Sequence, residues 1–259
     1  MERLRSERPR GLDRAGLRKW GMLFLALGIF GRSILQNRFL GVAGMSTDQL
    51  LEAMSGSSDV MTAVTIALIL QFVECCAAPI FSLLAAEGMA HTANGEKYLL
   101  RVAGIAVLSE IPYNFAMSGN LLQVSSRNPV FGLLMALLLL YLYNRFAEAK
   151  PMNLLYKAAF TIAAFFWLAV LKIDNGLPCM ILTLAFWLFR RKPLVRNLVA
   201  GCAAMFCSLY SIFYMTAPLS MVILHFYNGK KEEQEKRMVN YLFYPAVLLI
   251  IGLAGVLAF

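Results

Sequence analysis

Residues 60–90 read VMTAVTIALILQFVECCAAPIFSLLAAEGMA, and this stretch decides the fold class. Its only charged residues are Glu74 and Glu87. About 20 predominantly apolar residues in a helix suffice to cross a bilayer, so this run is too long for a simple span. Because Glu74 and Pro79 interrupt it, we expect a tilted or kinked transmembrane helix.

The composition of the whole chain agrees with a membrane protein. Of the 259 residues, 59% are hydrophobic and 15% are charged, whereas a soluble domain has about 45–50% apolar and about 25% charged residues. So few charges cannot cover a water-soluble surface, and a disordered chain would need low hydrophobicity. The net charge of +9 is what the positive-inside bias of membrane proteins predicts, so no nucleic-acid partner follows from it.

Nine apolar stretches predict an all-α, polytopic bundle of about nine transmembrane helices. Placing the N-terminus inside assigns 20 of the 24 Lys and Arg residues to cytoplasmic segments, which supports nine crossings with the C-terminus outside. The sixth and eighth stretches are short for full crossings. The stretches are 18–36, 60–90, 98–116, 129–145, 153–172, 177–190, 197–214, 216–228 and 239–258.

The domain organisation follows from the same pattern. Residues 1–19 are predicted to form a basic cytoplasmic arm, and residues 20–259 a single transmembrane domain, because no linker or internal repeat divides them. The five cysteines all lie in apolar runs without metal-ligand spacing. We interpret them as packing residues and expect no metal site.

Glu87 and His91 form the first candidate site. Ionisable groups in a hydrocarbon environment are costly and are often functional, and residues four apart share one helix face. A carboxylate can orient an imidazole for general-base catalysis. We expect His91 and Arg101, near the start of the next helix, to face a shared cytoplasmic-side cavity. A structural helix-end cluster would explain the same pattern.

Other polar residues have both functional and structural interpretations. Glu110 lies beside Pro112 and either lines a cavity or pairs with Arg32 or Arg127. For Arg32, snorkelling to the outer interface is the simpler explanation. Glu74 has no partner that the sequence identifies. Asp174 belongs to an Asp-Asn-Gly sequence that predicts first a tight turn between the fifth and sixth spans.

Eight short motifs resemble the TraX family of membrane proteins. They occur in the family's order across residues ~70–250. They are APIF (78–81), EGMAHT (87–92), KYLLR (97–101), SEIPY (109–113), RNPVF (127–131), DNG (174–176), YNGK (227–230) and FYP (243–245).

This resemblance implies a fold and an activity. The namesake member is associated with conjugal transfer and acetylates the N-terminus of a pilin subunit, and the fold is related to larger polytopic acyltransferases that use cytoplasmic acyl-CoA. Three positions depart from the family. Residues 28–32 read GIFGR where an Asp-His pair is usual, Val247 replaces a histidine, and Cys75 and Cys76 stand where an arginine is common.

The sequence therefore favours an acetyl-CoA-dependent N- or O-acetyltransferase acting at the membrane. His91, oriented by Glu87, is the expected general base, and Glu110 and Asp174 would line the path of the acceptor. A non-enzymatic transporter or assembly partner with buried charges lining a cavity is the alternative, and a purely structural bundle is a third hypothesis. The residues expected near the acetyl-CoA phosphates are Lys97, Arg101, Asn228 and Lys230.

The predicted partners follow from these hypotheses. The chain would lie in a lipid bilayer, the bacterial inner or plasma membrane by family resemblance, as a multi-pass protein. The acceptor would be a protein, a peptide or a glycan. The sequence predicts no oligomeric state.

Overall fold

The computed structural model describes residues 11–41, 45–122, 126–148, 150–230 and 237–258. Residues 1–10 of the predicted arm (1–19), residues 231–236 and Phe259 lie outside the described residues, and α1 begins within the predicted arm at Arg14. Within the described ranges the regular elements are helical, which confirms the all-α prediction. They are α1 (Arg14–Phe30), the π-helix η1 (Gly31–Phe39), α2 (Thr47–Gly56), α3 (Ser58–Cys75), α4 (Ala77–His91), α5 (Gly95–Ser118), α6 (Val130–Arg145), α7 (Pro151–Val170), α8 (Gly176–Leu188), α9 (Pro193–Phe206), the 3-10 helices η3 (Cys207–Leu209) and η4 (Ile212–Leu219), α10 (Ser220–His225) and α11 (Arg237–Ala258).

All nine predicted apolar stretches coincide with helical segments. The seventh and eighth stretches, 197–214 and 216–228, are divided earlier than predicted, because extended backbone at Ser211 separates η3 from η4 and η4 continues across residue 215. The sequence analysis missed α2, which begins with a capping box formed by Ser46 and Gln49. A serine followed three residues later by glutamine is a sequence signal for a helix start, so α2 was detectable.

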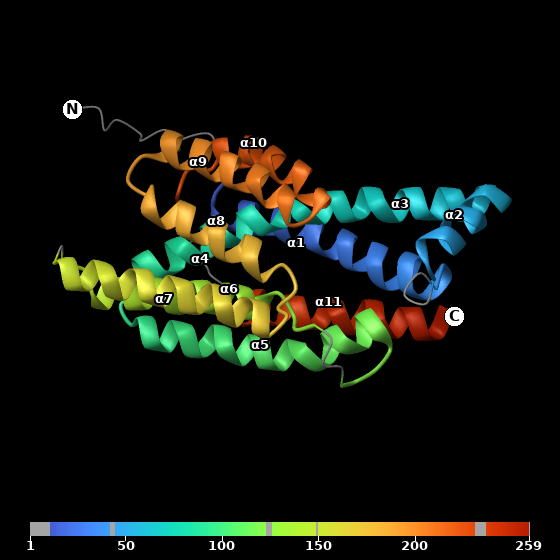
Figure 1. Ribbon diagram of the computed structural model, residues 1–259, viewed down its shortest axis with the longest axis horizontal. Coiled ribbons are helices and arrows are strands. Elements are labelled where there is room, and N and C mark those ends of the chain that lie inside the picture. The colour runs from blue at the N-terminus through green and yellow to red at the C-terminus, as the bar shows by residue number, and fades with distance from the viewer. Residues whose placement is uncertain (1–10, 42–44, 123–125, 149, 231–236, 259) are drawn as a thin grey trace, which may run out of the picture.

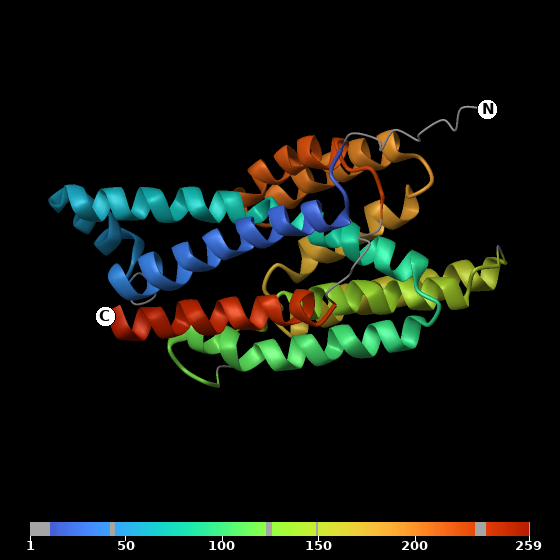
Figure 2. The same ribbon diagram turned by 180° about the vertical axis from the view of Figure 1, so that it is seen from behind.

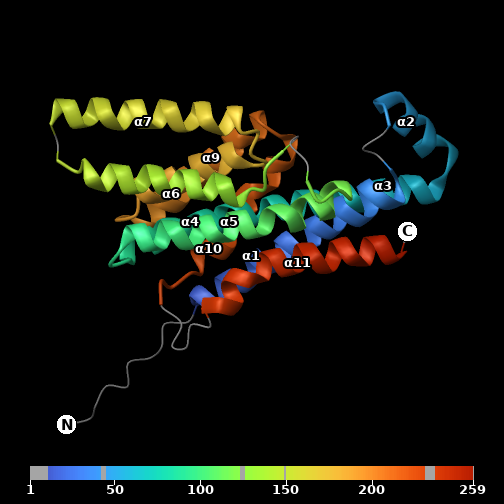
Figure 3. The same ribbon diagram turned by 90° about the horizontal axis from the view of Figure 1, so that it is seen from below.

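The helices run mostly along the long axis of the molecule (Figure 1). From behind, α1 is seen between α3 and α11 (Figure 2), and it contacts both. The view from below places α7 and α2 at opposite ends (Figure 3). Five helices contact one another in a closed ring in the order α1, α4, α6, α5 and α11.

The long apolar stretch forms two consecutive helices. α3 ends at Cys75 and α4 begins at Ala77, which confirms the predicted interruption between Glu74 and Pro79. Together they span Ser58–His91, 34 residues, or about 51 Å at 1.5 Å per residue. A hydrocarbon core is about 30 Å thick, so the pair must tilt or extend beyond it.

Among the described residues, three helical segments are long and apolar enough to cross a membrane: Ser58–His91, which α3 and α4 form together, Pro151–Val170 and Asn240–Ala258. Four shorter apolar helical segments accompany them: Val130–Arg145, Gly176–Leu188, Pro193–Leu209 and Ile212–His225. The number of crossings and the side on which the N-terminus lies stay predictions.

Candidate functional site

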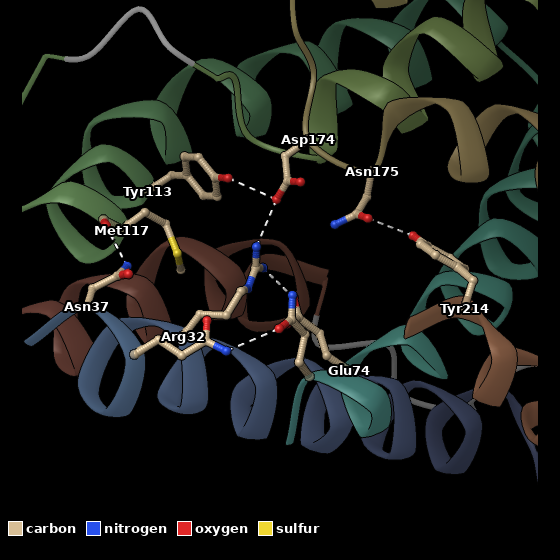
Figure 4. A network of polar contacts seen from close by, with 10 residues as sticks. Arg32, Asn37, Glu74, Tyr113, Met117, Asp174, Asn175 and Tyr214 are labelled. Carbon is tan, nitrogen blue, oxygen red and sulfur yellow. Dashed lines mark hydrogen bonds and ion pairs between the residues drawn. The ribbon is translucent and has the colours of Figure 1, made fainter. Parts of the chain in front are cut away.

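A group of ionisable residues meets in the middle of the molecule, and we call Arg32, Glu74, Tyr113 and Asp174 the mid-bundle cluster. Arg32 donates from Nη1 to Asp174 Oδ2 at 2.9 Å and from Nη2 to Glu74 Oε1. The Tyr113 hydroxyl donates to the same Asp174 Oδ2 at 2.9 Å. Figure 4 shows Asp174 reaching Arg32 from the turn before α8. The cluster thus joins four elements far apart in sequence.

This arrangement corrects the expectation for Arg32. Its side chain is only 14% exposed and lies between two carboxylates, so it does not snorkel to an interface. Gly28 makes the contact possible, because a Cβ at that position would overlap the side chain of Glu74. Removing one partner of a buried ion pair typically costs about 3–5 kcal/mol, so each member of the cluster depends on the others.

The π-helix η1 is held against the C-terminal end of α5. Ser33 Oγ donates to the carbonyl of Ala116 at 2.7 Å, and Asn37 Nδ2 donates to that of Met117 at 2.6 Å. The last four carbonyls of a helix have no partner within it, so these side chains satisfy the end of α5. The same contacts fix Arg32, one residue before Ser33, in position.

Glu110 supports the turn that carries Asp174. Its carboxylate accepts from Arg127 Nη1 at 3.0 Å and from Asn128 Nδ2 at 2.6 Å. The backbone of Arg127 then pairs with the α7–α8 turn, accepting from Asp174 N at 2.9 Å and donating to the Lys172 carbonyl at 3.0 Å. Of the two pairings predicted for Glu110, the structure shows the one with Arg127. Both oxygens of this carboxylate are engaged, so Glu110 positions the Asp174 turn.

The predicted tight turn at Asp174 is confirmed. Asn175 has a left-handed backbone, with φ of 52°, and its side-chain oxygen accepts from the Tyr214 hydroxyl at 2.9 Å. Gly176 packs against Gly132 of α6, where a Cβ would lie 2.6 Å from the Gly176 Cα. These contacts hold the start of α8 beside the mid-bundle cluster.

The cluster borders a cavity of about 410 Å³. A second cavity of about 240 Å³ adjoins it and is lined by all five helices of the ring. We call the two together the axial cleft, because they share the lining residues Met22, Phe81, Val130, Leu133, Asn240 and Tyr244.

The axial cleft follows one face of α1 over most of its length. Arg14, Arg18, Met22 and Leu25 line it at spacings of three or four residues, and Arg32 lines its deep end. The 18 residues from Arg14 to Arg32 correspond to about 27 Å of helix. The cleft therefore runs from a basic mouth, as we call the end lined by Arg14 and Arg18, to a part-buried group of two acids and one arginine.

A second group of charges lies near the mouth, and we call Arg14, Glu87, Arg196 and Tyr227 the Glu87 cluster. Glu87 Oε2 accepts from Arg14 at 3.4 Å and from the Tyr227 hydroxyl, and Oε1 accepts from Arg196 at 3.5 Å. Burial lowers the pKa of Arg14, but Tyr227 and Glu87 outweigh burial and hold this pKa above its ordinary value. The cluster ties α1, α4, α9 and the end of α10 together.

The expected pairing of the Glu87 carboxylate with His91 does not occur. His91 is exposed, and its Nδ1 lies 2.8 Å from the backbone carbonyl of Glu87. A carbonyl only accepts hydrogen bonds, so Nδ1 carries the proton and Nε2 is left as the basic nitrogen of the neutral ring. His91 lines a cavity of about 250 Å³ together with Arg190 and Arg196. Arg101 is exposed and is not among the residues lining it, so the structure does not bring His91 and Arg101 into one cavity.

The residues expected near phosphates are divided between solvent and internal contacts. Lys97, Arg101 and Lys230 are exposed. Asn228 is half-buried; its amide donates to the Gly11 carbonyl at 3.4 Å, and its Oδ1 accepts from Lys230 N at 3.0 Å. Asn228 thus holds the chain after α10 against the segment before α1.

Three groups that the sequence analysis did not assign emerge from the structure. Arg32 with Glu74 and Asp174 forms the mid-bundle cluster, Arg14 and Arg18 form the mouth of the cleft, and Arg190 and Arg196 line the His91 cavity. The 3.6-residue periodicity of Arg14, Arg18, Met22 and Leu25 could have indicated a shared face. The long-range pairs carry no local signal.

Comparison with known protein families identifies the family of this chain. The family model described as TraX protein matches residues 39–255. The chain belongs to the TraX family. No curated protein and no solved structure matches it.

The TraX-like motifs gather at two places in this structure. APIF, SEIPY, DNG and FYP contribute residues to the mid-bundle cluster or its cavity, whereas EGMAHT and YNGK contribute Glu87, His91 and Tyr227 at the other end. Family membership and the long apolar helices make this TraX-family chain a membrane protein. The mid-bundle cluster with its cavity, and the region around Glu87 and His91, are therefore the two candidate functional regions.

Proposed function

We propose that this protein transfers an acetyl group from cytoplasmic acetyl-CoA to an amine or hydroxyl acceptor, and that the transfer takes place at the mid-bundle cluster. The observation that carries the proposal is the axial cleft, which joins a basic mouth to part-buried acids inside a ring of five helices. The N-terminal end of α1 is the predicted cytoplasmic end, which is the side from which acetyl-CoA would come.

The residues along the cleft suit a long, phosphate-bearing substrate. Arg14 and Arg18 at the mouth supply guanidinium groups, which bind phosphate well. The exposed Lys97 and Arg101 flank Tyr98, which lines the mouth. Together with Lys230 they are proposed outer contacts for the phosphates. Met22, Phe81 and Leu133 form an apolar middle section that excludes water.

The deep end of the cleft offers groups for acyl transfer. Acetyl-CoA would supply an acetyl thioester there. Both contacts of Asp174 reach Oδ2, which leaves Oδ1 to take the proton of an acceptor N–H or O–H. The acceptor atom would then bond to the acetyl carbon as the C–S bond breaks, and the proton would pass to the departing CoA thiolate. Arg32 Nε is buried without a partner in the described part of the chain. It is a donor available for the thioester carbonyl oxygen as negative charge develops on it.

His91 is the competing base. Its Nε2 is available beside two arginines, but it is exposed and the Glu87 carboxylate does not orient it. Glu87 and Glu110, the other proposed catalytic residues, have both carboxylate oxygens bound within the protein. The geometry therefore favours Asp174 over His91, and gives Glu87 and Glu110 positioning roles.

The non-enzymatic alternative rests on the same cavity. A transporter or an assembly partner would use Arg32, Glu74 and Asp174 to hold a ligand or to stabilise the bundle. It would perform no acyl transfer. The two hypotheses differ in a measurable way: the enzyme would bind acetyl-CoA and release CoA, whereas the alternative would not.

Acetyl-CoA binding tests the proposal without knowledge of the acceptor. Full-length protein in lipid nanodiscs should bind radiolabelled acetyl-CoA, and Arg18→Gln should weaken binding roughly tenfold or more, as expected for a lost charge-assisted contact. Arg191→Gln, an exposed change away from the cleft, is the matched control. Release of CoA in the presence of unblocked peptides or hydroxyl-bearing glycans would then report transfer. Absence of acetyl-CoA binding at millimolar concentration would reject the enzyme and favour the alternative.

A further inference from the structure

The cavity beside His91 is not used by the proposed transfer, and its charges do not balance. It lies between α4, α8 and α9, and its ionisable lining residues are Glu87, His91, Arg190 and Arg196. Glu87 is the only acid among them, and it also accepts from Arg14 outside the cavity. The cavity therefore holds one carboxylate and two guanidinium groups, and the carboxylate is shared with the guanidinium of Arg14. This surplus of positive charge attracts an anion.

Arg190 and Arg196 are held by different contacts, and both keep N–H donors that these contacts do not use. Arg196 is 8% exposed, and its ion-pair contact with Glu87 is long, at 3.5 Å. Arg190 stacks on Trp187, with its guanidinium carbon 4.1 Å from the ring centroid, and donates from Nη1 to the Trp187 carbonyl at 2.9 Å. A guanidinium has five N–H donors, so donors remain on both residues for a further acceptor.

His91 adds a third group to this surface. Its Nδ1 is fixed by the backbone carbonyl of Glu87, so Nε2 is the nitrogen left for a ligand. Two guanidinium groups supply the N–H donors that the oxygens of a phosphate ester need, since arginine binds phosphate through paired N–H donors. The Nε2 of His91 would accept from a phosphate hydroxyl in the neutral ring, or donate to a phosphate oxygen in the imidazolium form. A cavity of about 250 Å³ also accommodates the group to which the phosphate is attached.

We propose that this cavity is a phosphate-binding site, formed by Arg190, Arg196 and His91 and separate from the axial cleft. α4 divides the two: Glu87, Ala90 and His91 line the phosphate site, whereas Leu84, Ala85 and Gly88 line the cleft. The phosphate belongs either to an anionic lipid headgroup or to a free phosphate compound. Anionic lipid would reach the site at the membrane surface, where basic residues attract it.

Thermal unfolding of the full-length protein in neutral detergent tests this proposal without acetyl-CoA. Ligands that bind the native state raise the unfolding midpoint with concentration. The probes are inorganic phosphate, short-chain phosphatidylglycerol, and phosphatidylcholine of the same chain length. A rise with phosphatidylglycerol alone identifies a lipid headgroup, and a rise with inorganic phosphate identifies a free phosphate. No rise with either anionic probe would overturn the proposal.

Variants separate this site from general attraction to a basic surface. Arg196→Gln should weaken the apparent affinity for the effective probe by roughly 10- to 100-fold, the loss expected for a buried charge-assisted contact. Arg190→Gln, at an exposed position whose change leaves the bundle intact, should weaken it about tenfold. Arg191→Gln is the control, because Arg191 is exposed and outside the cavity lining. Equal losses in Arg190→Gln and Arg191→Gln would contradict a built site.

Discussion

The mid-bundle cluster and the Glu87 cluster have opposite charge balances. In the first, one arginine lies between two carboxylates; in the second, one carboxylate lies between two arginines. Asp174 keeps one oxygen free of the contacts seen in the cluster, whereas both oxygens of Glu87 are occupied. An acid is available for chemistry only where its partners leave an oxygen uncommitted. This criterion selects Asp174.

The surroundings of the two clusters support the same distinction. The mid-bundle cluster lines the deep end of the axial cleft and is part-buried, and electrostatic interactions are stronger where water is partly excluded. The Glu87 cluster links the start of α1 to α4, to α9 and to the end of α10. We therefore interpret the Glu87 cluster as a structural contact between helices. The adjoining His91 cavity keeps an excess of positive charge from Arg190 and Arg196.

The largest effect is expected from replacing Asp174, the proposed base, because this change tests directly whether the mid-bundle cluster is the reactive one of the two clusters. Asp174→Asn keeps the size of the side chain but removes its basicity, so acetyl transfer should fall by about 10²–10⁴-fold. The rate of CoA release in single-turnover experiments measures this effect.

Glu74→Gln is the matched control for Asp174→Asn. It also removes one negative charge from beside Arg32 but leaves the proposed base in place, so the loss should be much smaller. Equal losses in the two variants would show that the acids only balance the charge of Arg32.

Protein stability tests whether the mid-bundle cluster needs the close packing of Gly28 against Glu74. Gly28→Ala places a Cβ against Glu74, and overpacking of this kind typically costs about 1–3 kcal/mol. The midpoint of thermal unfolding in detergent measures the cost. Gly104→Ala is the control, since a Cβ there meets nothing within 4 Å; it should be neutral or stabilising. A neutral Gly28→Ala would mean that Glu74 does not need its present position.

Glu110 should have a smaller, indirect effect on activity. Glu110→Gln weakens the contacts with Arg127 and Asn128 that hold the Asp174 turn. We expect transfer to fall by roughly tenfold, the equivalent of a lost charge-assisted hydrogen bond, with acetyl-CoA binding unchanged. Hydrogen exchange at residues 172–176 should increase, a change that a directly catalytic Glu110 would not require. An unaltered exchange rate with a large loss of transfer would instead make Glu110 catalytic.

The sequence predicted the positions of most helices, but it did not predict which side chains from different helices contact one another. Each of the nine apolar runs coincides with helix, because hydrophobic length is a local property, whereas α2 has no such run. The turn at Asp174 was equally local. The partners of Arg32 were missed because Glu74 and Asp174 lie 42 and 142 residues away. Only the packing of α1, α3 and the α7–α8 turn brings them together.

Local reasoning also produced the incorrect pairing. Glu87 and His91 share a helix face, as their spacing predicts, but spacing says nothing about Arg14, Arg196 and Tyr227, which approach from other elements. These partners occupy the carboxylate. A charged residue at helical spacing is therefore a candidate partner, and a cation from another helix can displace it.

The smallest expected effect belongs to the residue that the sequence favoured most. His91→Gln should lower acetyl transfer by less than about threefold, because His91 is exposed and lines a cavity on the other side of α4 from the axial cleft. A general base at this position would instead make the loss about 10²–10⁴-fold. The measurement is CoA release by the variant and by wild type at saturating acetyl-CoA, with His225→Gln as the control because His225 is the other histidine. If His91→Gln abolishes transfer while acetyl-CoA binding and the unfolding midpoint stay unchanged, the reaction takes place at the His91 cavity, and the mid-bundle cluster is structural. If transfer persists and Asp174→Asn abolishes it, the oxygen left uncommitted at Asp174 identifies the base.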